Sequence, residues 1–99
     1  MKNSDDSGYT GKHVGVCVLD TGIFPHIDFG SRISVFRDFT GVRRSPYDDN
    51  GHGTCTCGII AGNGLASNKI YTGVAPEVTI HCFKAFDKLG KGYVSDILF

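Results

Sequence analysis

The sequence has no excess of charge of either sign, because ten lysines and arginines balance ten aspartates and glutamates. This balance provides no overall attraction for nucleic acid or for an anionic membrane surface. The sequence also lacks an apolar run of the roughly 20 residues that a membrane-spanning helix requires. Its first seven residues are polar and no apolar stretch follows them, which does not fit a signal peptide. We therefore expect neither a nucleic-acid nor a membrane partner. The location stays open between an intracellular chain and one whose export segment was removed or not included.

Internal repeats and low-complexity tracts are absent as well. Hydrophobic residues make up 40% of the 99 positions and aromatic residues 11%, which is ordinary for a globular fold and argues against disorder. A chain of this length forms one domain or part of one.

Four cysteines are present, and an even number is compatible with disulfides. Cys17, Cys57 and Cys82 lie inside apolar runs, where a free thiol behaves as a small hydrophobic group. We therefore expect buried, reduced thiols. Cys55 and Cys57 are two positions apart on an expected helix, so their side chains diverge and do not form a zinc site together.

The hydrophobic pattern predicts the order strand, strand, helix, strand, helix. The expected ranges are 13–19, 32–39, 52–62, 77–86 and 93–99. The first range is a continuous valine-rich run, typical of a strand buried on both faces of a parallel sheet. In the first helix we expect Thr56, Ile59, Ile60 and Gly62 to form one side.

This order predicts an α/β fold, a three-layer αβα arrangement around a parallel sheet. Three strands and little helix leave edges and faces of the sheet uncovered, which is a hazard for an isolated domain. We therefore interpret residues 1–99 as one incomplete domain that a partner segment completes.

Asp20 follows the first predicted strand, and Thr21 and Gly22 turn the chain away from it. Open α/β sheets place functional groups at such strand ends. A carboxylate there can accept a hydrogen bond from a histidine and fix its tautomer. The alternative is that Asp20 only caps the following turn.

His52 lies 32 positions after Asp20, between Gly51 and Gly53 at an expected helix start. The positive end of a helix disfavours the imidazolium, whereas a carboxylate partner favours it. A histidine in this balance can act as a general base near neutral pH. The alternative is a solvated histidine without a partner.

Residues 16–22, Val-Cys-Val-Leu-Asp-Thr-Gly, and 49–54, Asp-Asn-Gly-His-Gly-Thr, resemble two motifs of the subtilisin-like serine proteases. Residues 73–84 are similar to the next stretch of that family, and 90–92 fall where the family has its substrate-binding strand. The resemblance runs from about Gly8 to the end of the sequence. It implies a peptidase with the triad order Asp, His, Ser that is known for this family.

The resemblance implies roles for five residues. Asp20 corresponds to the orienting carboxylate and His52 to the general base. Gly90, Lys91 and Gly92 correspond to an extended edge that pairs with the backbone of a peptide or protein substrate.

The resemblance also bears on cofactors and specificity. Asp28 falls near a calcium ligand of the family, but the matching loop 63–72 lacks a clear set of oxygen ligands, so we expect no cofactor, with calcium as the alternative. Tyr93 or Val94 corresponds to the border of a pocket for an apolar substrate residue.

The serine nucleophile that the family needs is missing from the sequence. No Gly-Thr-Ser motif occurs, Ser95 lies in a segment that does not match it, and the oxyanion-hole asparagine is expected beyond Phe99. We therefore expect the chain alone to be inactive and its partner to be the remaining part of the catalytic domain.

The chain also departs from the family after His-Gly-Thr, where relatives usually continue His-Val-Ala-Gly and this chain has Cys55-Thr56-Cys57-Gly58. Cys55 replaces a polar residue one turn from His52, so it either packs inertly, which we favour, or makes the enzyme sensitive to thiol reagents.

Two other functions compete with the peptidase interpretation. One is a non-catalytic module whose 90–92 edge binds extended peptides or another chain without hydrolysis. The other is a metal site formed by Asp20, His52 and Cys55, which are residue types that bind zinc.

Overall fold

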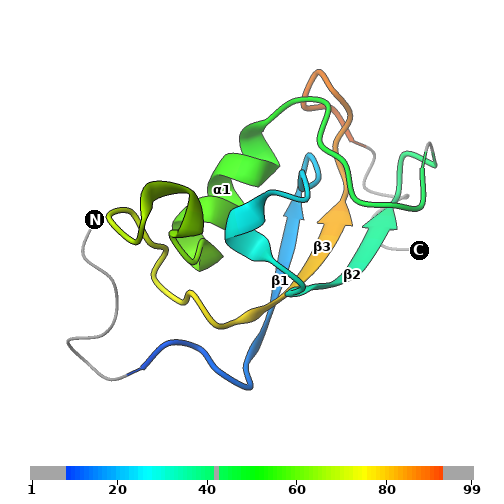
Figure 1. Ribbon diagram of the computed structural model, residues 1–99. Coiled ribbons are helices and arrows are strands. Elements are labelled where there is room, and N and C mark those ends of the chain that lie inside the picture. The colour runs from blue at the N-terminus through cyan, green and yellow to red at the C-terminus, as the bar shows by residue number, and fades with distance from the viewer. Residues whose placement is uncertain (1–8, 42, 93–99) are drawn as a thin grey trace.

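The computed structural model describes residues 9–41 and 43–92. Strands β1 (Gly15–Asp20), β2 (Ile33–Asp38) and β3 (Thr79–Lys84) form a parallel sheet in the order β1-β3-β2. Helix α1 (His52–Ala61) and the 3-10 helices η2 (Ile27–Phe29) and η3 (Leu65–Ser67) lie on one side of this sheet (Figure 1). The predicted α/β fold with a parallel sheet is therefore confirmed.

The three predicted strands and the first predicted helix are all present, with ends that differ by a few residues. The first strand begins later than predicted and includes Asp20 as its last residue. The helix predicted from Tyr93 lies outside the described residues. In the part of the chain that the structure describes, no helix is long and apolar enough to cross a bilayer.

The core lies between α1 and the sheet. β3 contributes alternate residues to the core. Ile80 and Cys82 are buried, whereas the residues that follow each of them, His81 and Phe83, are only partly buried. The buried hydrophobic cluster consists of Val18, Ile23, Phe29, Cys57, Ala61, Val78, Ile80 and Cys82. This packing fixes α1 over the carboxyl ends of β1 and β3, where the functional side chains lie.

The prediction that β1 is buried on both faces is wrong for the described residues. Val18 and Asp20 point toward the core and are buried, whereas Leu19 is 50% exposed and Cys17 is exposed. The apolar run predicts two covered faces, but among residues 9–41 and 43–92 only the α1 side of the sheet carries helices.

The predicted buried side of α1 also needs correction. The buried residues of α1 are Gly53, Cys57 and Ala61, which recur every four positions, while Ile59 is 55% exposed. Small residues face the sheet because the helix approaches it closely. Ile60 packs against the edge of the core and is partly buried, whereas Ile59 is turned away from the sheet.

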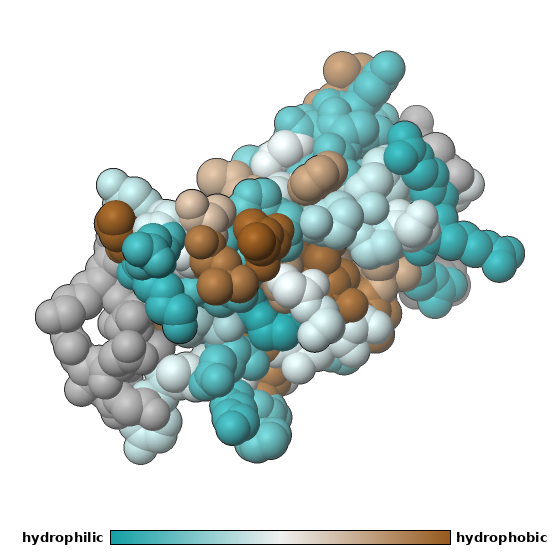
Figure 2. Space-filling view, viewed as in Figure 1, coloured by the Kyte–Doolittle hydropathy of each residue, from teal (hydrophilic) through white to brown (hydrophobic). Residues whose placement is uncertain are grey.

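Several large hydrophobic side chains remain exposed on the α1 side. Figure 2 shows hydrophobic atoms gathered over the middle of this face. Ile27 of η2, Ile59 of α1 and Leu65 of η3 are each more than half exposed, and η2 contacts both α1 and η3.

All four cysteines are free, as predicted. Cys57 and Cys82 are buried, and burial raises the pKa of each thiol to about 12. Such thiols stay protonated and unreactive near neutral pH. Cys17 was predicted to be buried but is exposed, because it lies on the uncovered face of the sheet.

Candidate active site

Asp20 ends β1 at the carboxyl edge of the sheet, beside Lys84 at the end of β3. Its side chain is only 12% exposed. The carboxylate oxygen Oδ1 accepts a hydrogen bond from the backbone N–H of Thr21 at 2.7 Å. This short local bond holds the carboxylate in one orientation.

His52 begins α1 and lies directly over this carboxylate. Its Nδ1 is 2.8 Å from Asp20 Oδ1, while the side chain as a whole is 71% exposed. The pKa of His52 is raised above its ordinary value, first by the hydrogen bond to Asp20 and then by the charge of Asp20. One ring nitrogen is thus bound to a fixed carboxylate on an otherwise exposed ring.

The turn before His52 depends on the left-handed conformation of Gly51, whose φ is 100°. The side chain of Asn50 accepts a hydrogen bond from the His52 N–H at 3.1 Å. Its amide nitrogen donates to the carbonyl of Lys88 at 2.8 Å. The side chain of Asn50 therefore connects the backbone of His52 to the loop after β3.

Asp48 anchors the first turn of α1. Its Oδ2 accepts from both the N–H and the hydroxyl of Thr54, and its Oδ1 accepts from the N–H of Gly51 at 2.8 Å and the hydroxyl of Thr21 at 2.9 Å. The Thr21 hydroxyl in turn accepts from the N–H of Gly53 at 2.9 Å. Although burial opposes ionisation, these hydrogen bonds to the carboxylate leave the pKa of Asp48 well below its ordinary value.

The helix approaches the turn after β1 so closely that only glycine fits at position 53. A Cβ atom on Gly53 would lie 2.2 Å from the carbonyl oxygen of Gly22 and 2.9 Å from its nitrogen. This close contact brings the ring of His52 within reach of Asp20.

Gly90 and Lys91 lie in a turn that closes on Asp87, and Gly92 follows this turn. The N–H of Gly90 and both backbone groups of Lys91 bond to Asp87 within this turn. Among the described residues, no hydrogen bond uses the carbonyl of Gly90 or the N–H of Gly92. Gly90 lines a pocket of about 340 Å³ together with Asp20, Thr21, Asn50, His52 and Phe86.

The structure thus brings Asp20, His52 and Gly90 to one pocket, whose lining residues do not include Lys91 or Gly92. Tyr93, Val94 and Ser95 lie outside the described residues.

The proposed metal alternative does not assemble. Cys55 lines a different pocket of about 530 Å³, whose lining includes neither Asp20 nor His52. Over residues 9–41 and 43–92 no group of three or more His, Cys, Asp or Glu side chains could hold a metal ion.

The sequence did not predict that Thr21, Asp48 and Lys84 hold the segments of the site together through hydrogen bonds. Lys84 had a recognisable signal, because it continues the buried alternation of Val78, Ile80 and Cys82 in β3. A lysine at a buried position of a strand indicates an ion pair.

The calcium alternative at Asp28 requires free oxygen ligands around this residue. Oδ1 of Asp28 accepts from the N–H of Ala66 at 2.8 Å. The guanidinium of Arg32 donates to the carbonyls of Asp28 and Ala61, each at 2.6 Å, and to that of Val78 at 3.1 Å.

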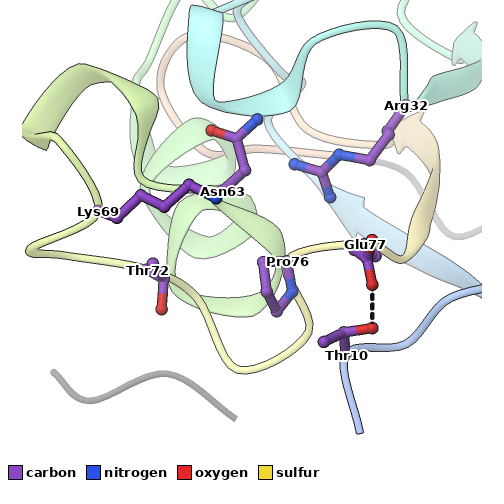
Figure 3. Close-up of a pocket in the computed structure, with 7 residues that line it drawn as sticks. All are labelled: Thr10, Arg32, Asn63, Lys69, Thr72, Pro76 and Glu77. Carbon is purple, nitrogen blue, oxygen red and sulfur yellow. Dashed lines mark hydrogen bonds between the residues drawn. The ribbon is translucent and has the colours of Figure 1, made fainter. Parts of the chain in front are cut away.

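Arg32 also lines a pocket of about 430 Å³ with Lys69, and Figure 3 shows these two side chains extending toward Asn63 from opposite sides. Calcium requires six to eight oxygen ligands. The guanidinium of Arg32 already occupies the carbonyl oxygens of Asp28 and Ala61, and this bonded set of donors does not fit a calcium ion.

We expect that a chelator leaves the thermal unfolding midpoint of the chain unchanged, because Arg32 crosslinks this region in place of an ion. Replacing Arg32 with methionine should lower the free energy of unfolding by about 2 kcal/mol, since three carbonyls lose a charged donor. Arg44→Met is the matched control, as Arg44 is exposed, and it should change stability by less than about 0.5 kcal/mol. A midpoint that falls with chelator, or rises with added calcium, would contradict this expectation.

A buried strand-end carboxylate bonded to an exposed histidine at a helix start has the geometry that an Asp–His pair needs for proton transfer. The chain belongs to the Subtilase family, whose sequence pattern matches residues 11–98.

Individual relatives agree with this assignment. The chain is 46% identical to "Serine protease AprX" of Bacillus subtilis (strain 168) over 89 residues, which are 90% of this chain and 20% of that protein. It is 41% identical to "Subtilisin Savinase" of Lederbergia lenta, over 91% of this chain and 32% of the relative. The crystal structure of "a cold adapted subtilisin-like serine proteinase" superposes with a TM-score of 0.78 at 32% identity, covering 92% of this chain and 31% of the other. The chain therefore spans about a third or less of the length of these relatives.

Proposed function

We propose that this chain supplies the base and its orienting carboxylate to the active site of a serine endopeptidase. Asp20 orients His52, and the serine nucleophile and the oxyanion-hole asparagine come from a part of the catalytic domain outside this sequence. The observation that carries the proposal is the 2.8 Å contact between His52 Nδ1 and Asp20 Oδ1 on an otherwise exposed ring.

The contact supports a defined sequence of proton transfers. Asp20 accepts the Nδ1–H of His52, which leaves Nε2 unprotonated. Nε2 takes the proton of the serine hydroxyl as its oxygen attacks the peptide carbonyl, and it later gives that proton to the leaving amine. Asp20 remains ionised throughout and stabilises the imidazolium, consistent with its raising of the His52 pKa.

Residues 90–92 provide a substrate track beside this pair. The carbonyl of Gly90 and the N–H of Gly92 are the backbone groups that the Asp87 turn does not use. We propose that they pair with the backbone of an extended peptide, which makes binding tolerant of many side chains. A peptide bound there would present its scissile bond to the pocket of His52.

A non-catalytic binding module would use the same track without needing a histidine held by a carboxylate. The Asp20–His52 contact therefore favours the peptidase over the binding module.

The sequence that follows Phe99 in the gene is the first test of this proposal. It should encode an asparagine and a Gly-Thr-Ser motif at the family spacing, and the absence of both would overturn the peptidase assignment. A fluorophosphonate probe supplies the second test, because it labels only activated serines. The chain alone should not react, whereas the longer protein should be labelled at one serine.

A further inference from the structure

We infer that Lys84 is a positioning residue that holds the Asp20 carboxylate, the loop before His52 and the start of the substrate track in register. The inference rests on the proposed function, because only that function explains why these segments must be held in register. Its evidence is the geometry of a buried ammonium group.

Lys84 is the last residue of β3 and is only 1% exposed. Its Nζ donates to the carbonyl of Thr21 at 2.6 Å, to Asp49 Oδ1 at 2.8 Å and to the carbonyl of Phe86 at 2.9 Å. These acceptors use all three ammonium hydrogens. The ammonium also lies 5.0 Å from the ring centroid of Tyr47, a cation–π contact.

The three acceptors come from the three segments that form the site. The Thr21 N–H donates to the Asp20 carboxylate, so a bond to the carbonyl of the same residue restrains the backbone that holds this carboxylate. Asp49 lies in the loop that leads to His52. Phe86 lines the pocket of His52 and precedes the turn to Gly90.

The backbone hydrogen bonds of Asp20 join only two of these three segments. The carbonyl of Asp20 accepts from the N–H of Ala85 at 2.9 Å and from that of Phe86 at 3.3 Å, which joins β1 to the residues after β3. Among the bonds made by the described residues, only those of Lys84 reach all three segments from one atom. Because burying a charge is costly unless it is paired, Lys84 keeps these partners together.

The test measures the pKa of His52 by NMR titration of its ring protons in the complete catalytic domain that contains this chain, and the titration requires no catalytic activity. In Lys84→Met we expect this pKa to fall toward about 6.5, the value of an unperturbed histidine, because Asp20 is no longer held against Nδ1. Loss of a positive charge by itself acts in the opposite direction and raises the pKa of a histidine. The sign of the change therefore separates positioning from simple electrostatics.

Lys12→Met is the matched control, since it removes an exposed lysine before the opposite end of β1 and should leave the His52 pKa unchanged. Lys84→Gln keeps two N–H donors and should give a smaller fall, which also covers the case in which Lys84→Met does not fold. Cooperative unfolding of each variant is confirmed before titration. An unchanged or raised His52 pKa in a folded Lys84 variant would overturn the inference. If the pKa falls as expected but the longer protein shows no serine-dependent hydrolysis, the proposed function fails and the positioning role stands.

Discussion

Replacing His52 with alanine in the complete catalytic domain that contains this chain is expected to lower kcat on the order of a million-fold, and Asp20→Asn on the order of ten-thousand-fold. These magnitudes are those of subtilisin-type triads, the family to which this chain belongs. The physical reason is that, in the proposed mechanism, His52 carries the proton, whereas Asp20, 2.8 Å from its Nδ1, only orients and stabilises the ring. Steady-state hydrolysis of a chromogenic peptide measures both effects.

His13→Asn is the matched histidine control. His13 is exposed, lies before the opposite end of β1 and has a φ of 69°, a conformation that asparagine tolerates. It should leave kcat unchanged. A His52→Ala enzyme that retains a substantial fraction of the activity would contradict the assignment of the base.

The pH dependence supplies a second readout of the same pair. The base must be unprotonated, so kcat/KM should rise with pH through the pKa of His52, which Asp20 raises. In Asp20→Asn the residual activity should therefore begin to rise at lower pH than in the parent enzyme. A shift to higher pH would show that Asp20 does not act on His52 in solution.

Gly53→Ala is expected to destabilise the fold and separate His52 from Asp20. The new methyl group would lie 2.2 Å from the carbonyl oxygen of Gly22, which is backbone and cannot rotate away. We expect a loss of about 3 kcal/mol in the free energy of unfolding, measured by urea denaturation. The pKa of His52 should fall in parallel, because the first turn of α1 must move off the strand end.

Gly58→Ala in the same helix is the matched control. A Cβ atom there meets nothing within 4 Å, so the substitution should raise stability by about 0.5–1 kcal/mol through helix propensity alone. Equal effects at positions 53 and 58 would mean that the close contact with Gly22 is not present in solution.

The sequence predicted the three strands, the helix that begins at His52, and the pairing of Asp20 with His52, because each has a strong local pattern. Asp20 stands at the end of an apolar run, and His52 stands between glycines at a helix start. The sequence could not show that the small side chains of α1 face the sheet. That choice depends on how closely the helix and the turn at Gly22 approach, which is a tertiary property.

The supporting residues were missed for a related reason. Asp48 stands in a run of Asp, Asn and Gly that is typical of turns and predicts no support for a helix. Its partners Thr21 and Thr54 are 27 positions before it and 6 after it, so the hydrogen bonds become visible only when the chain is folded. Residues that support a site from different segments leave weak sequence signals of this kind.

The uncovered face of the sheet has a consequence for how the stability of this chain should be measured. Leu19 and Val35 are exposed there, and the strands that carry them, β1 and β2, are the outer strands of the three-stranded sheet. Any segment that binds this surface only in the folded state acts as a thermodynamic ligand, and at a hundredfold excess over its Kd it adds about 2.7 kcal/mol to the free energy of unfolding. The unfolding midpoint of this chain is then a function of the concentration of that segment, and a titration of the midpoint would yield the affinity between the two.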